Sequence, residues 1–545
     1  MYCNKTNVNI LTSLLVAHGV RRAVVCPGSR NAAIVHNLNE SPDIECFPVT
    51  DECSAGFFAI GIAQATGEAV AVCVTSGSAL LNLAPAVAEA HYQHIPLIVV
   101  SADRPQQWID QLDGQTLPQP GALGCFVRKT VQLPEPANAD ERWYCNRLVN
   151  EALIEAQQGP VHINVPITEP LFCFDVPQLP AERVIRRYFP SADVRLPDDF
   201  LTDLRHSHRP LIIVGQCSKP LNINIDEPDA PIVLHETLSV FNRTCNVDEA
   251  LAAATPDTLW PDLVIYVGDA IVSKRLKAFV RKSAGAKTWR VSADGNVEDT
   301  FQNLCGIIVG RPESVMPEVW RAVKACADTD ADFANAWRTT ISDARTKSLA
   351  YNPDYSQVMA VKLFEQKIEQ AAADCFVHYA NSISVRLANI YANHFVWCNR
   401  GVNGIEGSLS TAAGFSATTD KTTFCVIGDL SFFYDQNALW NQNLRGNFRI
   451  LLINNGCGAI FNQLSGLDKS AARNRFVAAE HNTTAMGICQ QNNVLYLSAH
   501  NQYELAAGLD ELFTLQSDRP ILLEVFTSAQ TDEKNFREIT LNNNR

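Results

Sequence analysis

Short, nearly unbroken runs of apolar residues recur along the chain, and most end in a turn rich in glycine, serine, aspartate or asparagine. The clearest are residues 22–26, 70–75, 96–101, 211–215, 263–268, 424–428, 450–454 and 521–525. Runs that are apolar at every position are typical of parallel strands buried on both faces. Helix-compatible segments such as residues 54–66 lie between them, and this alternation predicts βαβ units. The sequence therefore predicts an α/β protein.

The length of 545 residues suits several domains. We expect three doubly wound parallel-sheet domains, over residues 1–178, 190–345 and 354–545. A proline-rich stretch around residues 168–210 is typical of a linker between the first two. Residues 311–346 are compatible with one helix, which Tyr351-Asn352-Pro353 would end.

Composition excludes several classes of function. The net charge of −14 argues against broad nucleic-acid binding, which needs a basic face. The sequence has no run of about 18 apolar residues that predicts a membrane span. The first residues lack the order of a signal peptide, and the 17 cysteines are scattered without a disulfide or zinc spacing. We therefore expect a cytoplasmic protein with reduced thiols.

Two polar segments follow predicted strands in the third block and suit a metal-bound diphosphate. They are Gly428-Asp429-Leu430-Ser431 and Asn454-Asn455-Gly456-Cys457-Gly458, with Asp429 and Asn455 26 positions apart. Mg²⁺ prefers oxygen ligands, and the Asp429 carboxylate, the Asn455 amide oxygen and a carbonyl near Cys457 are such ligands. Glycines let backbone N–H groups approach phosphate. Each segment alone is also an ordinary turn, so the prediction depends on finding both.

Charged residues at other loops are the next candidates. Glu52 stands at the start of a predicted apolar helix. It is either an acidic first turn favoured by the helix dipole or a carboxylate that shares a proton with a heterocycle nitrogen. Basic residues also recur at loops: Arg30, Arg104, Lys274, Arg275, Arg386 and Arg400. Any one of them can be surface charge, but together they predict a substrate with several carboxylates, because arginine binds carboxylates in bidentate fashion.

The pair of segments in the third block resembles the signature of thiamin-diphosphate enzymes, and the three blocks resemble their pyrimidine-binding, middle and diphosphate-binding domains. Further motifs resemble one family, the 2-succinyl-5-enolpyruvyl-6-hydroxy-3-cyclohexene-1-carboxylate synthases of menaquinone biosynthesis. These motifs are residues 26–30 (Cys-Pro-Gly-Ser-Arg), 51–57, 75–79, 102–105, 399–405 and 409–412. They extend over nearly the whole chain, and their combination is specific.

The resemblance implies a reaction. Thiamin diphosphate adds to 2-oxoglutarate, CO2 leaves, and the succinyl carbanion equivalent adds to isochorismate. The resemblance also gives roles to residues. Glu52 matches the catalytic glutamate at the aminopyrimidine N1′, Ile405 the apolar residue that bends the cofactor, and Asp429, Asn455 and the Cys457 carbonyl the ligands of Mg²⁺ or Mn²⁺. Implied cofactor contacts are Glu52, Ser78, Ile405, Gly428, Asp429, Leu430, Ser431, Asn455, Ile460 and Phe461. Implied substrate contacts are Arg30, Arg104, Gln115, Lys274, Arg275, Ser382, Arg386 and Arg400.

The resemblance also implies a homodimer or higher homo-oligomer with active sites between subunits. The chain departs from the family pattern at Cys53, Ser78 and Cys457, where arginine, threonine and glycine are usual. Two other functions remain open: an acetolactate-synthase-like carboligase, which does not explain the arginines, and a non-catalytic binding protein on the same fold.

Overall fold

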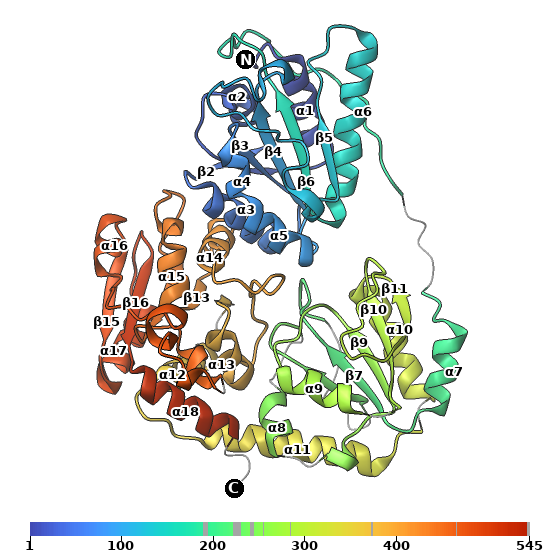
Figure 1. Ribbon diagram of the computed structural model, residues 1–545, viewed down its shortest axis with the longest axis vertical. Helices are drawn as coiled ribbons and strands as arrows, with labels where there is room; N and C mark the ends of the chain where they lie inside the picture. The colour runs from blue at the N-terminus through green and yellow to red at the C-terminus, as the bar shows by residue number, and fades with distance from the viewer. Residues whose placement is uncertain are drawn as a thin grey trace.

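The computed structural model describes residues 1–188, 194–221, 230–239, 245–253, 256–283, 285–326, 328–371, 374–464 and 466–541. It has three lobes, each built on a parallel β-sheet with flanking helices (Figure 1). The first lobe lies at the top of Figure 1, the middle lobe at lower right and the third at lower left. The predicted α/β class with three parallel-sheet domains is confirmed.

The first lobe has its strands in the spatial order β2-β1-β3-β4-β6-β5. They are β1 (Arg22–Val25), β2 (Glu45–Pro48), β3 (Val70–Val74), β4 (Leu97–Asp103), β5 (Lys129–Gln132) and β6 (Val161–Pro166). Its helices are α1 (Thr6–Ala17), α2 (Ala32–Glu40), α3 (Glu52–Thr66), α4 (Ser78–Asn82), α5 (Ala84–Tyr92) and α6 (Ala139–Glu155). In β3, Val70 and Val72 join the core under α3 and α5, whereas Ala71 joins the core under α1 and α6. Burial on both faces explains the unbroken apolar run.

The middle lobe has its described strands in the order β11-β10-β9-β7-β8. They are β7 (Pro210–Val214), β8 (Ile232–His235), β9 (Leu263–Val267), β10 (Lys287–Ser292) and β11 (Leu304–Val309). Its helices are α7 (Asp198–His206), α8 (Val247–Ala253), α9 (Lys274–Lys282), α10 (Pro312–Cys326) and α11 (Ala331–Ala350). The single helix predicted over residues 311–346 is wrong, because α10 and α11 are separate. Asp330 starts α11, and its carboxylate accepts from the N–H groups of Asp332 and Phe333.

The third lobe has its described strands in the order β12-β13-β14-β16-β15. They are β12 (Phe376–Tyr379), β13 (Thr423–Gly428), β14 (Phe448–Asn454), β15 (Leu495–Ala499) and β16 (Ile521–Phe526). Its helices are α12 (Gln357–Gln370), α13 (Ile383–Tyr391), α14 (Ser408–Ala417), α15 (Asp429–Tyr434), α16 (Met486–Gln491), α17 (Gln502–Thr514) and α18 (Ala529–Leu541). The carboxyl ends of β13 and β14 therefore lie side by side.

The first and third lobes share a hydrophobic core, in which α3 packs against α14. Glycines allow this close approach. A Cβ atom at Gly61 would lie 1.9 Å from the Thr411 carbonyl oxygen, and one at Gly414 would lie 2.0 Å from the Phe58 carbonyl oxygen. Among the described residues, the structure contains no helix with the length and apolarity that crossing a membrane requires.

Candidate active site

The two polar segments of the third lobe meet at the carboxyl ends of β13 and β14, as the sequence predicts. Asp429 is buried at the start of α15. Its Oδ2 accepts from the N–H groups of Gly456 (2.8 Å) and Asn455 (3.2 Å), and its Oδ1 accepts from the Leu430 N–H (2.7 Å). One carboxylate thus joins both segments.

The oxygen donors near Asp429 suit a hard cation. The Asn455 Oδ1 lies 3.3 Å from the Cys457 N–H, so the amide oxygen and the Cys457 backbone belong to the same turn. Carboxylate, amide and carbonyl oxygens are the donor types that Mg²⁺ takes. A Cβ atom at Gly428 would meet nothing within 4 Å, so open space lies at the end of β13. The residues present therefore fit a metal-bound diphosphate.

The apolar wall predicted at Ile460 and Phe461 lies in the 3-10 helix η6 (Ala459–Gln463). A Cβ atom at Gly458 would meet the Phe461 ring at 2.9 Å and the Leu430 Cδ1 at 3.3 Å. Phe461 and Leu430 thus flank the turn that follows Asn455. Ser431 is buried in α15. These predicted cofactor contacts belong to the same cluster as Asp429.

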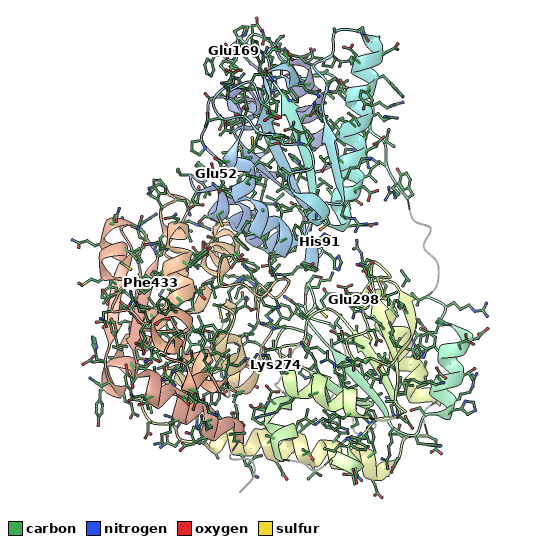
Figure 2. The ribbon with its side chains drawn as sticks, viewed as in Figure 1. Glu52, His91, Glu169, Lys274, Glu298 and Phe433 are labelled. Carbon is green, nitrogen blue, oxygen red and sulfur yellow. The ribbon has the colours of Figure 1, made fainter. Side chains whose placement is uncertain are left out.

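Glu52 is the first residue of α3, which begins because the Asp51 side chain accepts from the Ser54 N–H (3.1 Å). The half-buried Glu52 carboxylate accepts a hydrogen bond from Asn82 Nδ2 (3.1 Å). The Asp51 carboxylate also accepts from Asn437 Nδ2 in the 3-10 helix η5 (Gln436–Leu439), which directly follows α15. This end of α3 therefore lies against the segment that Asp429 begins, and Figure 2 shows Glu52 where α3 approaches the third lobe.

Arg104, which follows β4, and Gln115 lie together beside the carboxyl end of β3, and Arg30 lies close to Asp103, since its partner Ile167 donates its N–H to the Asp103 carbonyl (3.0 Å). A Cβ atom at Gly77, beside the exposed Ser78, would lie 3.1 Å from Gln115. Arg104 Nε donates to the Gly114 carbonyl (3.2 Å), which holds that loop over the sheet. Arg30 donates to the Ile167 carbonyl (3.0 Å) and pairs with Glu169 (3.3 Å). Figure 2 shows Glu169 at the top of the first lobe, well away from Glu52.

Arg386 and Arg400 form a second basic group, at the boundary of the middle and third lobes. Arg386 on α13 lies 3.5 Å from the Val272 carbonyl and 3.9 Å from Asp248. Burial, Asp248 and the charge of Arg400 act on Arg386, and burial dominates, so its pKa is lowered. Arg400 is 9 % exposed and donates to Asn381 Oδ1 (3.1 Å). Within the described residues, its buried Nε has no hydrogen-bond partner, so it keeps donor capacity.

The remaining predicted substrate residues differ in how far they are engaged. Arg275 on α9 donates to the backbone carbonyls of Asp248 (2.9 Å) and Thr540 (3.0 Å), so it ties the middle lobe to α18. Lys274 is exposed, and Figure 2 shows it on the side of the middle lobe that faces the third. Ser382 precedes α13 with a positive φ of 72°.

The Asn381 side chain holds the loop that carries Arg400 and Ile405 at two points of its backbone. Asn381 Nδ2 donates to the carbonyls of Asn399 (2.6 Å) and Gly404 (2.8 Å). Ile405 itself is 41 % exposed. The side chain is therefore accessible to a ligand.

The comparisons with known proteins agree with this geometry. Residues 5–122 match the family described as thiamine pyrophosphate enzyme, N-terminal TPP binding domain. Over nearly its whole length the chain resembles proteins named 2-succinyl-5-enolpyruvyl-6-hydroxy-3-cyclohexene-1-carboxylate synthase. That of Bacteroides thetaiotaomicron is 42% identical, over 99% of both chains. That of Porphyromonas gingivalis is 35% identical, over 96% of this chain and 95% of its own. The chain belongs to this synthase family.

The first lobe of this synthase is thus a thiamin-diphosphate-binding domain, and the resemblance drawn from the motifs is confirmed. Three nearby residues carry no sequence signal that singles them out. His481 Nε2 lies 3.4 Å from Asp429 Oδ2, and the nearby carboxylate raises the pKa of His481. Glu89 on α5 accepts from the N–H groups of Gly401 and Val402 (both 2.7 Å), beside Arg400. Asp532 accepts from the Asn455 side chain.

Proposed function

We propose that the chain decarboxylates 2-oxoglutarate and adds the succinyl unit to isochorismate, which gives the product for which its relatives are named. The reaction belongs to menaquinone biosynthesis, and its enzymes are thiamin-diphosphate-dependent transferases. The observation that carries the proposal is the meeting of Asp429 and Asn455 at the ends of β13 and β14, in a chain of this family.

Asp429, Asn455 and the Cys457 carbonyl would hold Mg²⁺ or Mn²⁺ and, through it, the cofactor diphosphate. When bound, thiamin diphosphate supplies the nucleophile and the electron sink that decarboxylation needs. Glu52 would hold a proton at the aminopyrimidine N1′, and the exposed Ile405 would support the bent cofactor. Gly428, Leu430, Ser431 and Ser78 would line the cofactor, with Ile460 and Phe461 as apolar cover.

Arg400 and Arg386 are the best candidates to bind substrate carboxylates. Both are largely withdrawn from water, and Arg400 keeps a free donor among the described residues. A carboxylate would satisfy that donor and relieve the repulsion between the two guanidinium groups. Arg30, Arg104, Gln115, Lys274, Arg275 and Ser382 are proposed as further substrate contacts.

Product identification tests the proposed reaction. The purified protein is incubated with thiamin diphosphate, Mg²⁺, 2-oxoglutarate and isochorismate, and the products are identified by mass spectrometry. The Glu52→Gln variant is expected to lose about 100-fold or more of the rate, since a positioned proton-transfer group contributes about that much. Glu68→Gln, at an exposed glutamate of the same lobe, is the matched control and is expected to act like the parent.

Two results would contradict the proposal. Turnover of pyruvate without use of 2-oxoglutarate would indicate an acetolactate-synthase-like enzyme. Cofactor binding without turnover of either 2-oxo acid would indicate a non-catalytic protein.

We further propose a homodimer or higher homo-oligomer with active sites between subunits. Exposed large apolar side chains that such contacts between subunits would cover include Tyr92, Trp108, Leu112, Tyr434, Trp440 and Phe476. Light scattering after size-exclusion chromatography tests it, and a monomer at micromolar concentration would contradict it. We also propose a cytoplasmic location, since the cysteines whose side chains the structure describes are free thiols.

A further inference from the structure

The Asp532 side chain is completely buried in the first turns of α18, where its carboxylate accepts three hydrogen bonds. Its Oδ1 accepts from the Gln357 N–H at the start of α12 (2.7 Å). Its Oδ2 accepts from the Thr527 hydroxyl (2.7 Å) and from Asn455 Nδ2 (2.9 Å). A buried carboxylate is tolerated when its lone pairs are satisfied in this way.

The contact with Asp532 decides which way the Asn455 amide faces. An amide has an oxygen on one side and an NH2 group on the other, and only the NH2 group can donate. Because Asp532 accepts that hydrogen, the Asn455 Oδ1 must face the opposite side, where the Cys457 N–H lies 3.3 Å away. That is the side of the proposed cation.

The neighbouring amide is held in the same manner. Asn454 Nδ2 donates to the buried carboxylate of Glu524 (2.8 Å), and its oxygen accepts from the Gly456 N–H (3.1 Å). Each amide of the Asn-Asn pair therefore has its NH2 group bound by a buried carboxylate on a different element, β16 or α18. The turn presents amide oxygens because two acids accept the amide nitrogens.

We propose that Asp532 is a positioning residue that fixes the Asn455 amide with its oxygen toward the metal ion. The inference rests on the proposed metal site at Asp429, Asn455 and Cys457. Asp532 acts through Asn455 and touches neither the metal nor a substrate.

The Asp532→Asn variant separates this role from simple packing, because it keeps the shape and changes one acceptor into a donor. The new NH2 group must face either the Gln357 N–H or Asn455. A backbone N–H cannot reverse, whereas the Asn455 amide can rotate and the Thr527 hydroxyl can turn to accept. Asn455 would then present its nitrogen to the cation, and an amide nitrogen is not a ligand for Mg²⁺.

The test measures binding and does not depend on turnover. Thiamin diphosphate binding is followed by isothermal titration calorimetry at increasing Mg²⁺ concentrations in the parent, Asp532→Asn and Thr527→Val. Asp532→Asn is expected to need about 10- to 100-fold more Mg²⁺ for half-maximal binding, the usual effect of losing an outer-shell partner. Excess Mg²⁺ is expected to restore its activity. Thr527→Val also removes a hydrogen bond to Asp532 but leaves Asn455 in place, so its Mg²⁺ requirement should match the parent's.

Each outcome decides the proposal. An unchanged Mg²⁺ requirement in Asp532→Asn would overturn it, and so would an equal loss in both variants, which would mean that Asp532 only supports packing. A parent that binds thiamin diphosphate equally well without metal would overturn the metal site as well. If Asp532→Asn fails to fold, Asp532→Ser is used, since its hydroxyl can accept from Gln357 and leaves Asn455 unheld. The same direction of change is expected, and no change would refute the role.

Discussion

The packing of α3 on α14, between the first and third lobes, predicts a large effect from adding one methyl group. A Cβ atom at Gly61 would lie 1.9 Å from the Thr411 carbonyl oxygen and 2.7 Å from the Phe415 nitrogen. An ordinary contact needs about 3.5 Å, so α3 and α14 must separate by about 1.5 Å. The obstacle is helix backbone, which cannot rotate away as a side chain can. Gly61→Ala is therefore expected to cost about 3 kcal/mol of overpacking, the upper end of the usual range.

Helix propensity acts in the opposite direction and sets the net value. Replacing glycine by alanine inside a helix gains about 1 kcal/mol, which leaves a net loss of about 2 kcal/mol in the free energy of unfolding. Gly487 in α16 is the matched control, because a Cβ atom there would meet nothing within 4 Å. Gly487→Ala should avoid the overpacking loss, so its free energy of unfolding should equal or slightly exceed the parent's.

Urea unfolding followed by tryptophan fluorescence measures both variants, and calorimetry measures their affinity for thiamin diphosphate. Because α3 begins at Glu52, separating the helices should also weaken cofactor binding by Gly61→Ala. If Gly61→Ala were as stable as Gly487→Ala and bound the cofactor like the parent, the glycine-mediated packing of α3 on α14 would be refuted.

Three further predictions concern single polar groups. Burial raises the pKa of Asp435 to about 7, above its value in the unfolded chain. The folded state therefore binds this proton more tightly, and stability falls as pH rises from about 4 to 7, by at most about 4 kcal/mol. Asp435→Asn, whose amide can still pair with Ser410, should lose that part of the pH dependence in urea titrations at pH 5 and 8; an unchanged slope would contradict it. Glu89→Gln should raise the KM for substrate, since one of the two N–H groups beside Arg400 loses its acceptor, at about 1.5–3 kcal/mol; an unchanged KM would contradict it. Arg400→Lys should lower kcat/KM about tenfold or more, because lysine lacks the planar fork; parent-like steady-state kinetics would exclude a carboxylate contact.

The sequence predicts interior strands and overlooks those at the edges, and the reason is burial. The predicted runs correspond to β1, β3, β4, β7, β9, β13, β14 and β16, and each of these has a neighbour on both sides in its sheet. Among the described residues, the edge strands β2, β5 and β15 are partly exposed and mix polar with apolar residues, so a search for continuous apolar runs cannot detect them. The edge strands β8, β11 and β12 are mainly apolar, but β8 and β12 are only 4 residues long and Gly306 lies within β11.

Two interior strands, β6 and β10, were also overlooked, and polar residues explain both. In β10, the buried Thr288, Arg290 and Ser292 alternate with apolar residues. In β6, the buried His162 and Asn164 interrupt the apolar run. Both side chains contact the Ser101 hydroxyl, and Asn164 also donates to Asp103 (2.8 Å). These partners come from β4, so the polar residues are satisfied across the sheet. A single sequence does not reveal a partner about 60 positions away.

The candidate site also contains contacts between distant residues that a single sequence does not reveal. The spacing of Asp429 and Asn455 predicts their meeting because both follow neighbouring strands of one sheet. Glu89 lies 312 positions from Gly401, and Asp532 lies 77 positions from Asn455. A single acidic residue has the same appearance in a sequence whether it faces solvent or holds a loop, so these two contacts were found only in the structure.

The predicted basic residues differ in how many of their N–H donors already have a partner within the protein. A guanidinium group has five N–H donors. Arg275 donates to the backbone carbonyls of Asp248 and Thr540. Arg30 donates to the Ile167 carbonyl and pairs with Glu169. Arg400 is buried with a free Nε among the described residues, beside the charge of Arg386. Burying like charges together is costly unless anions accompany them, and Asp248, 3.9 Å from Arg386, and the buried Glu236 already act on this pair. The unused Nε donor of Arg400 is therefore the strongest argument that a substrate carboxylate binds there. Arg275 has its contacts within the protein and serves mainly to join the middle lobe to α18.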